Sequence, residues 1–226
     1  AATAVDDLER QTLMQTLQDL PGPEVDAAIV TEIADADPGQ RTVLIRTLAN
    51  RRIRNAGTTL LKLATDEDPR VRLEALRALQ TVADPSLVEP LVELLARTTG
   101  DEEREAADRA VWRCSLQIAD PALRADALLT KLPNAGEAEQ AALLPALGRI
   151  GGPRALEVVQ QAIKSPAPAV REAGVRALTN WPDATVADQL WELVTQDPNT
   201  AHQTWALRAF ARVLPQLARE QPDQVA

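Results

Sequence analysis

The sequence predicts an all-α fold, a right-handed α-α superhelix of about 13 helices in six to seven two-helix units of about 31 residues. Three observations predict it. The segment DPRVRLEALRAL (68–79) recurs in pattern as APAVREAGVRAL (167–178). Two columns of Arg recur at nearly the same interval along the chain. Apolar residues fall at helical spacing, as in LVEPLVELL (87–95), in stripes wide enough to pack against two neighbours.

Each predicted unit is a short apolar helix followed by a helix that carries the Arg columns. The apolar helices are predicted at 24–35, 55–65, 85–98, 121–132, 153–165 and 184–196. The Arg-bearing helices are predicted at 4–19, 38–51, 69–83, 101–118, 137–150, 168–180 and 199–220. Asp-Pro pairs precede several of them, because Asp caps a helix and Pro fits its first turn. Pro90 and Pro145 fall inside helical patterns and are expected to kink them.

The repeat runs through nearly the whole chain, so residues 1–226 are predicted to form a single repeat domain. The polar tail EQPDQVA (220–226) is expected to fray. The only methionine is Met14, so the chain does not begin at an initiator and is expected to be either one module of a larger protein or a mature form after removal of a signal peptide. We expect this module to be monomeric. No apolar run of about 18 residues occurs, so no membrane insertion is expected. The compartment, cytoplasmic or exported, stays open.

Composition excludes several kinds of chemistry. A net charge of −9 disfavours nucleic-acid binding, which needs a basic face. Cys114 is the only cysteine, which excludes an internal disulfide, and it is predicted to be a small core residue. His202 is the only histidine, which excludes a multi-His metal site, and it is predicted to lie on the surface or in a turn. No phosphate-binding loop or nucleophile motif occurs, so we predict no enzyme activity, catalytic residue, metal or cofactor.

Two local patterns resemble those of HEAT repeats. In DPRVRLEAL (68–76) an Asp is followed by Val-Arg and a small residue, and a Pro interrupts the helix SLVEPLVELL (86–95). The resemblance covers residues 4–215 and implies that the Arg-bearing helices line a concave face. It also implies a ladder of Asp and Arg side chains between units, which Gln140 and Gln203 interrupt. The ladder residues are Asp37, Asp68, Arg41, Arg72, Arg104 and Arg171.

A second, weaker likeness concerns the run VRALTNWPDATVADQLWELV (175–194), which is similar to HEAT segments of large multidomain bacterial proteins of planctomycete type. Some HEAT-like proteins are enzymes, among them phycobilin lyases and DNA glycosylases. The net charge of −9 opposes the glycosylase alternative, which needs a basic groove.

The second Arg column lies five residues after the first, about 140° around a helix with about 100° per residue, so the two columns serve different faces. The second column and two Trp on the same helices form the predicted partner-binding set: Arg46, Arg77, Arg109, Arg176, Arg208, Trp112 and Trp205. A solvated face of intrahelical ion pairs is the alternative, because Glu74, Glu105 and Glu172 lie three or four residues before an Arg. Arg46 and Arg208 instead have a Thr four residues before them, so they lack a Glu at this spacing on their own helix.

The tryptophans have two possible roles, core filling between units or anchoring a partner. Trp191 lies within the apolar stripe of its helix, which favours the core. Trp112 and Trp205 lie on Arg-bearing helices. If one of the tryptophans anchors a partner, we expect it to be Trp112 or Trp205.

Residues 38–65 hold six cations and no acid, whereas residues 1–37 are acidic. The residues of a predicted anion patch here are Arg51, Arg52, Arg54 and Lys62. The alternative is that the acidic first helices neutralise these cations by packing beside them. Taken together, these patterns predict a non-enzymatic scaffold that binds a protein partner or an acidic segment on its concave face. A structural spacer between domains is the other reading.

Overall fold

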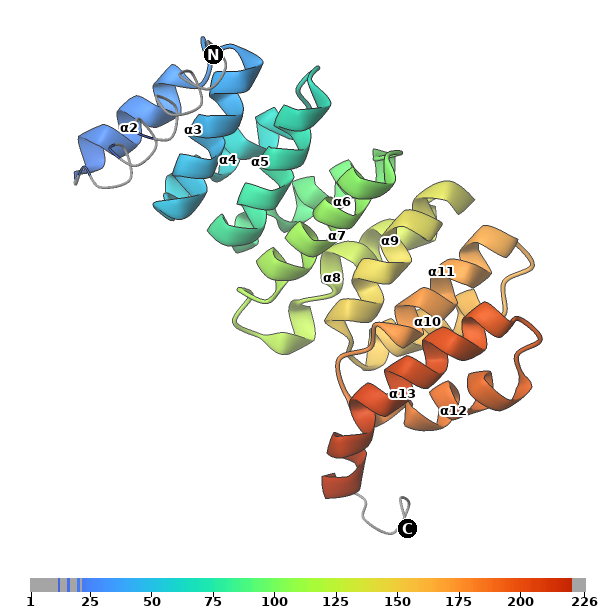
Figure 1. The fold of residues 1–226 in the computed structure, drawn as a ribbon. Coiled ribbons are helices and arrows are strands. Elements are labelled where there is room, and N and C mark those ends of the chain that lie inside the picture. The colour runs from blue at the N-terminus through green and yellow to red at the C-terminus, as the bar shows by residue number, and fades with distance from the viewer. Residues whose placement is uncertain (1–11, 13–15, 17–19, 21, 221–226) are drawn as a thin grey trace, which may run out of the picture. The chain divides into compact units, whose positions relative to one another are not determined.

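The computed structural model describes residues 22–220 together with residues 12, 16 and 20, without the side chains of Arg54 and Glu220. Between residues 22 and 220 the chain forms the α-helices α2 to α13, joined by short 3-10 turns, and no strand occurs in that range (Figure 1). The predicted all-α fold of paired helices is therefore confirmed. The helix predicted at 4–19 lies outside the described residues except for Thr12 and Thr16, and the predicted tail lies outside them beyond α13.

The helices gather into two compact units. The first comprises residues 1–91 and 99–117, and the second comprises residues 92–98 and 118–226. The helices of the first unit are α2 (Pro23–Glu32), α3 (Pro38–Asn50), α4 (Gly57–Leu63), α5 (Pro69–Val82), the start of α6 (Val88–Arg97) and α7 (Asp101–Ser115). Here α5 packs between α3 and α7, while α2 packs against α3 and α4 packs against α5.

The second unit repeats this arrangement. Its helices are the end of α6, α8 (Asp126–Lys131), α9 (Glu137–Ile150), α10 (Pro153–Ile163), α11 (Pro168–Thr179), α12 (Ala187–Gln196) and α13 (Thr200–Glu220). The Arg-bearing helix α11 packs between α9 and α13, while α10 packs against α11 and α12 packs against α13. Each unit is thus a row of long helices with shorter apolar helices along one side.

Asp residues begin the helices where the sequence predicts caps. The Asp37 side chain accepts a hydrogen bond from the Gln40 amide at 2.9 Å, and the Gln40 side chain accepts one from the Asp37 amide in return. Asp68 caps α5 by accepting from the Arg70 amide. Asp84 begins a 3-10 turn, so the helix predicted at 85–98 becomes α-helical only at Val88.

Pro90 therefore lies in the first turn of α6 and not in a helix interior. The amides of a first turn have no partner within their own helix, so a missing N–H costs little there. The predicted position of Pro90 inside a helix is therefore wrong. Pro145 does lie inside its helix, α9, which continues on both sides of it.

The core is aliphatic and the long helices approach closely. Leu, Ile, Val and Ala fill most of the buried positions, and Trp181 is among the largest fully buried side chains. Glycine permits the closest approaches: a Cβ on Gly148 of α9 would lie 2.1 Å from the carbonyl oxygen of Ala177 in α11. A Cβ on Gly174 of α11 would lie 2.7 Å from the amide nitrogen of Ile163 in α10. Three helices of the second unit are therefore held in backbone contact.

Candidate functional site: the Arg-bearing helices

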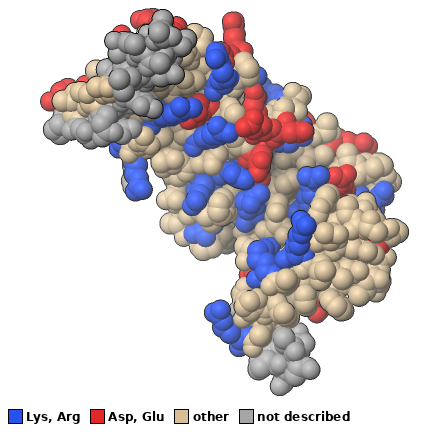
Figure 2. Space-filling view, in the orientation of Figure 1, with Lys and Arg blue, Asp and Glu red and all other residues tan. Residues whose placement is uncertain are grey.

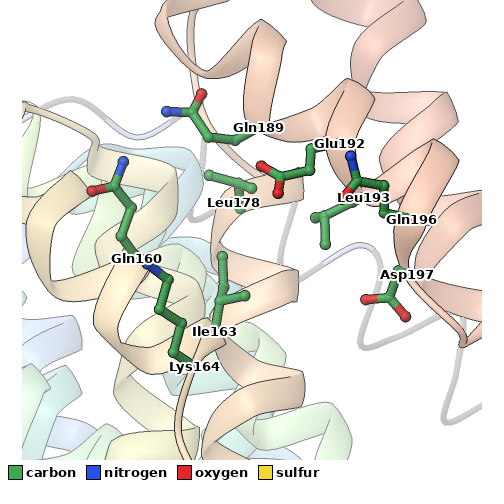
Figure 3. Close-up of a pocket in the computed structure, with 9 residues that line it drawn as sticks. All are labelled: Gln160, Ile163, Lys164, Leu178, Gln189, Glu192, Leu193, Gln196 and Asp197. Carbon is green, nitrogen blue, oxygen red and sulfur yellow. The ribbon is translucent and has the colours of Figure 1, made fainter.

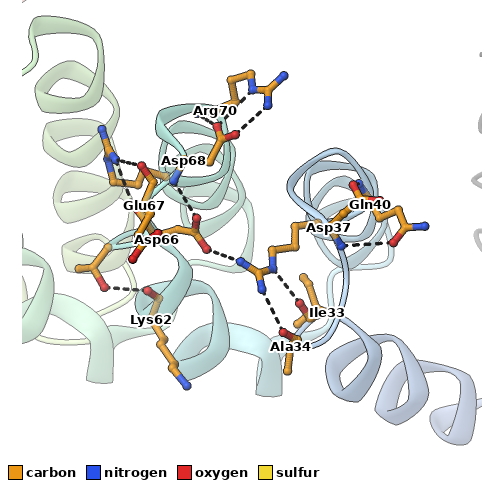
Figure 4. A network of polar contacts seen from close by, with 12 residues as sticks. Ile33, Ala34, Asp37, Gln40, Lys62, Asp66, Glu67, Asp68 and Arg70 are labelled. Atoms are coloured by element: carbon orange, nitrogen blue, oxygen red, sulfur yellow. Dashed lines mark hydrogen bonds and ion pairs between the residues drawn. The ribbon is translucent and has the colours of Figure 1, made fainter. Parts of the chain in front are cut away.

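The first Arg column ties each long helix to the end of the helix before it. Arg41 of α3 donates to the carbonyl oxygens of Ile33 and Ala34, at 3.3 and 3.0 Å, just past α2 (Figure 4). The same guanidinium donates to the Asp66 carboxylate, 2.8 Å away, beyond α4. One side chain thus satisfies carbonyls that a helix end leaves without partners, and it spans to the following helix pair.

Arg72 of α5 makes the equivalent contacts one repeat later. It donates to the carbonyl oxygens of Asp66 and Glu67 at 2.9 and 3.0 Å. It also forms an ion pair with Glu103 of α7 at 2.8 Å, and this acid raises the pKa of the Arg72 guanidinium. Asp68, an acid of the expected ladder, instead caps α5 and pairs with Arg70. The link between helix pairs thus runs from Arg to an acid of the next pair.

The two Gln residues that interrupt the Arg column make the same backbone contact. Gln140 donates to the Ala135 carbonyl oxygen at 2.9 Å, and Gln203 donates to the Asp197 carbonyl oxygen at 2.7 Å. Arg104 and Arg171 donate to the carbonyl oxygens of Thr99 and Ser165 respectively. The residues of this column therefore share a side-chain N–H donor long enough to reach a backbone carbonyl before their own helix. A Gln amide makes this hydrogen bond without a charge.

The second Arg column is largely neutralised in the first unit. Its three members there are half-exposed, and each forms an ion pair with a Glu. The pairs are Arg46 with Glu74, Arg77 with Glu102, and Arg109 with Glu105. Arg109 pairs within its own helix, whereas the other two pairs join neighbouring long helices. Arg46, which has no acid three or four residues before it, pairs with Glu74 of the neighbouring helix α5, and Arg77 pairs with Glu102 of α7.

In the second unit the column meets an aromatic ring. Arg176 of α11 pairs with Glu172 at 2.9 Å, and its guanidinium carbon lies 4.7 Å from the centroid of the Trp205 ring on α13. Such a cation-π contact is favourable and leaves the edge of the guanidinium open to a further partner. Arg208, one turn after Trp205, is exposed, and no ion pair involves it among the described residues.

The structure adds two residues to this face that sequence analysis missed. Arg212 and Arg219 are exposed on α13 and follow Arg208 at spacings of four and eleven residues, which places all three on one side of the helix. Trp205 precedes Arg208 by three residues and lies on the same side. Arg212 also donates to the carbonyl oxygens of Thr179 and Trp181, so this stripe is anchored to α11. The helical spacing alone could have identified it.

We call Arg176, Trp205, Arg208, Arg212 and Arg219 the α13 basic stripe. Between Thr200 and Arg219, α13 contains no Asp or Glu. Basic and acidic side chains mingle over much of the face in Figure 2, whereas around α13 the basic ones predominate. The stripe is therefore a local cationic surface on a chain whose net charge is −9.

The tryptophans are distributed differently from the prediction. Trp112 is half-buried with the guanidinium carbon of Arg113 4.9 Å from its ring centroid, and Trp205 is half-buried under Arg176. Trp181 is buried in the core. Trp191, assigned to an apolar stripe, is 50% exposed, so the core assignment is wrong for this residue.

The predicted anion patch is divided by neutralising contacts. Arg51 donates from Nε to the Asp26 carboxylate of α2 at 2.7 Å and from Nη1 to the Leu20 carbonyl oxygen. At Arg51 the alternative therefore holds, in which an acidic first helix neutralises the cation. Arg52 is exposed and has a positive φ of 53°. Lys62 is exposed on α4. The side chain of Arg54 lies outside the described part of the chain.

His202 and Cys114 are both buried. His202 was expected on the surface or in a turn, but it lies in α13 with its Nδ1 3.1 Å from the Asp197 carboxylate and its ring centroid 5.5 Å from that of Trp205. Burial raises the pKa of the Cys114 thiol to about 12, which leaves it unreactive at neutral pH. Among the described residues no group of His, Cys, Asp and Glu side chains could hold a metal ion.

A pocket of about 420 Å³ lies between α10, α11 and α12 (Figure 3). Its apolar part is formed by Ile163, Leu178 and Leu193. Its polar lining consists of Gln160, Lys164, Gln189, Glu192, Gln196 and Asp197. The lining thus mixes amides with charges of both signs.

Comparison with known proteins agrees with the repeat. A family model described as HEAT repeats matches residues 27–112 and 125–211. No curated protein matches the chain. Among solved structures, the crystal structure of an engineered protein from the Northeast Structural Genomics Consortium matches with a TM-score of 0.43 and 22% identity, covering 92% of this chain and 97% of that one.

A search of the described helices finds none that is both long and apolar enough to cross a membrane. The family model covers well over half of the sequence, and its two matches include most of the Arg-bearing helices described above. The chain belongs to the HEAT repeat family.

Proposed function

We propose that this protein is a non-enzymatic scaffold that binds an acidic segment of a partner protein along the α13 basic stripe. HEAT repeats commonly mediate protein-protein interaction. The observation that carries the proposal is the contrast between the two units. Arg46, Arg77 and Arg109 each have a Glu partner, whereas Arg208 has no ion pair among the described residues and α13 carries no acid before Glu220.

The stripe has the groups that such recognition needs. Exposed guanidinium groups bind carboxylates with paired hydrogen bonds, and these are stronger than neutral hydrogen bonds. Trp205 adds an apolar surface beside them, and an aromatic residue next to Arg is a common anchor at protein interfaces. The Arg176-Trp205 contact and the two carbonyl bonds of Arg212 hold the stripe in place, so little ordering cost remains for binding.

Fluorescence anisotropy with a labelled decaglutamate peptide tests the proposal. We expect binding that weakens as salt rises, and we expect Arg208→Glu with Arg219→Glu to abolish it. The matched control is Arg70→Glu with Arg97→Glu, which makes the same change of charge at two exposed Arg outside the stripe. Equal loss in both double variants would mean only nonspecific attraction. Absence of binding at low salt would favour a structural spacer.

A further inference from the structure

The pocket between α10, α11 and α12 is a groove with two polar walls and an apolar base, and none of the residues of the α13 basic stripe lines it. Gln160 of α10 and Lys164, which follows α10, lie on one side of the opening, and Glu192 of α12 lies on the other (Figure 3). Leu178 of α11 lies at the base. We call this pocket the α10–α12 groove. Its volume of about 420 Å³ is within the range of about 300–1,000 Å³ that is common for ligand pockets.

Elsewhere in the second unit, ion pairs join neighbouring apolar helices. The two pairs are Glu93 of α6 with Lys131 of α8, at 2.9 Å, and Asp126 of α8 with Arg154 of α10, at 2.6 Å. Lys164 and Glu192 offer the same combination of charges to α10 and α12. Neither of these two side chains forms an ion pair or a hydrogen bond among the described residues. The two walls of the groove therefore carry opposite charges that are open to a ligand.

The side-chain amides of the groove also lack protein partners. The Oε1 atom of Gln189 on α12 is buried, and it has no hydrogen-bond donor among the described residues. The side chains of Gln160 and Gln196 likewise make no hydrogen bond within the described part of the chain. A buried acceptor without a donor is unfavourable, and such atoms are uncommon in folded proteins. Gln189 thus indicates a donor that is supplied from outside the chain.

These features together favour a peptide segment as the ligand. Each Gln carboxamide donates and accepts hydrogen bonds, which matches the alternating N–H and C=O groups of an extended backbone. The aliphatic base, with Leu178 at its centre, matches an aliphatic side chain. A ligand with charge of only one sign would face repulsion from either Lys164 or Glu192, whereas a ligand with both signs is attracted to both walls.

We infer that the α10–α12 groove binds a short extended peptide segment in which an aliphatic residue stands between an acidic and a basic residue. The acidic residue pairs with Lys164, and the basic residue pairs with Glu192. The peptide backbone supplies the donor that Gln189 lacks, and the aliphatic side chain rests on Leu178. This inference does not depend on the proposed function, because the groove and the α13 basic stripe share no residue.

Nuclear magnetic resonance of the isotope-labelled chain tests the inference, because the side-chain amide signals of Gln160 and Gln189 report on the groove directly. The probes are capped peptides with Leu between Asp and Lys, in both residue orders. The comparison peptides replace Leu with Ser or Lys with Asp. We expect a mixed-charge peptide to shift both amide signals at about 1 mM and to bind about tenfold more tightly than the diacidic peptide. Replacing Leu with Ser should also weaken binding about tenfold.

A charge reversal on one wall separates recognition from a general effect on the fold. Glu192→Lys makes both walls cationic, so the diacidic peptide should now bind about tenfold more tightly than the mixed-charge peptide. The matched control is Glu89→Lys, which makes the same change of charge on exposed α6 outside the groove and should keep the wild-type preference.

Three results would overturn the inference. One is that neither order of the mixed-charge peptide shifts the two amide signals at about 10 mM. Another is that Glu192→Lys leaves the preference between the two peptides unchanged. The third is that free leucine binds the groove as tightly as the mixed-charge peptide, because the two charges recognised would then be those of a free amino acid.

Discussion

The side-chain amide of Gln203 lies 2.7 Å from the carbonyl oxygen of Asp197, where one repeat earlier the guanidinium of Arg171 reaches the carbonyl oxygen of Ser165. Gln140 does the same with Ala135. The property preserved along this column is therefore a donor that reaches back over the turn before its helix. At Arg41 and Arg72 the guanidinium also pairs with an acid of the next helix pair.

Replacing Gln140 tests this account. Gln140→Ala removes the donor to the Ala135 carbonyl, and we expect it to lower the free energy of unfolding by about 1 kcal/mol. Gln140→Arg should keep most of the wild-type stability, because Arg makes this contact elsewhere in the column. Urea unfolding monitored by circular dichroism measures both. If the Ala variant is as stable as wild type, the contact is incidental to the fold.

Gly148 is the residue whose replacement should be most damaging. A Cβ at this position would lie 2.1 Å from the Ala177 carbonyl oxygen, so α9 and α11 would have to separate. We expect Gly148→Ala to destabilise the protein by about 3 kcal/mol or more. Gly136→Ala is the comparison, since a Cβ there meets nothing within 4 Å. Because Gly136 is the N-cap of α9, where Ala is less favourable than Gly, we expect a cost of about 1 kcal/mol, well below that of Gly148→Ala. Thermal and denaturant unfolding of the two variants would separate a local clash from a general glycine effect.

The helices and their caps could be predicted because they depend on local sequence: the repeat interval, the apolar spacing, and Asp before Pro. The partners of the charged residues could not. Glu74 lies three residues before Arg77, yet it pairs with Arg46, because the long helices lie side by side and an acid can turn to either neighbour. The spacing of residues along one helix therefore does not predict which of two Arg side chains an acid will pair with.

Trp191 and His202 show the same limit for burial. Trp191 occupies a position that is core one repeat earlier, so its helical pattern correctly indicates an apolar face and says nothing of whether that face is covered. His202 is polar and near a helix start, which suggested the surface, but its contact with Asp197 satisfies it in a buried position. Both outcomes depend on packing between elements.

Asp68 gives a prediction for pH. The neighbouring Arg70 side chain, together with the Arg70 amide, lowers the pKa of Asp68 from 3.8 to about 2. Because the folded-state pKa is the lower one, the ionised carboxylate stabilises the fold above the ordinary pKa, and this contribution is lost as pH falls from about 4 toward 2. We expect Asp68→Asn to be less stable than wild type at neutral pH and the difference to close over that window. Thermal unfolding across the pH range measures it; a difference that is unchanged at low pH would show that the cap geometry, and not the charge, is what matters.

Leu178 and Leu207 offer the same substitution at a covered and an uncovered face. Leu178 is 1% exposed on α11, whereas Leu207 is 51% exposed on α13. Leu178→Ala removes buried methyl groups and leaves a cavity, which should cost roughly 2–5 kcal/mol. Leu207→Ala should change the free energy of unfolding by no more than about 0.5 kcal/mol in the isolated chain, because its side chain gains little from folding there. Denaturant unfolding at several protein concentrations measures both. A large cost for Leu207→Ala would mean that this side of α13 is already covered in solution, and a dependence of that cost on concentration would point to association between copies of the chain.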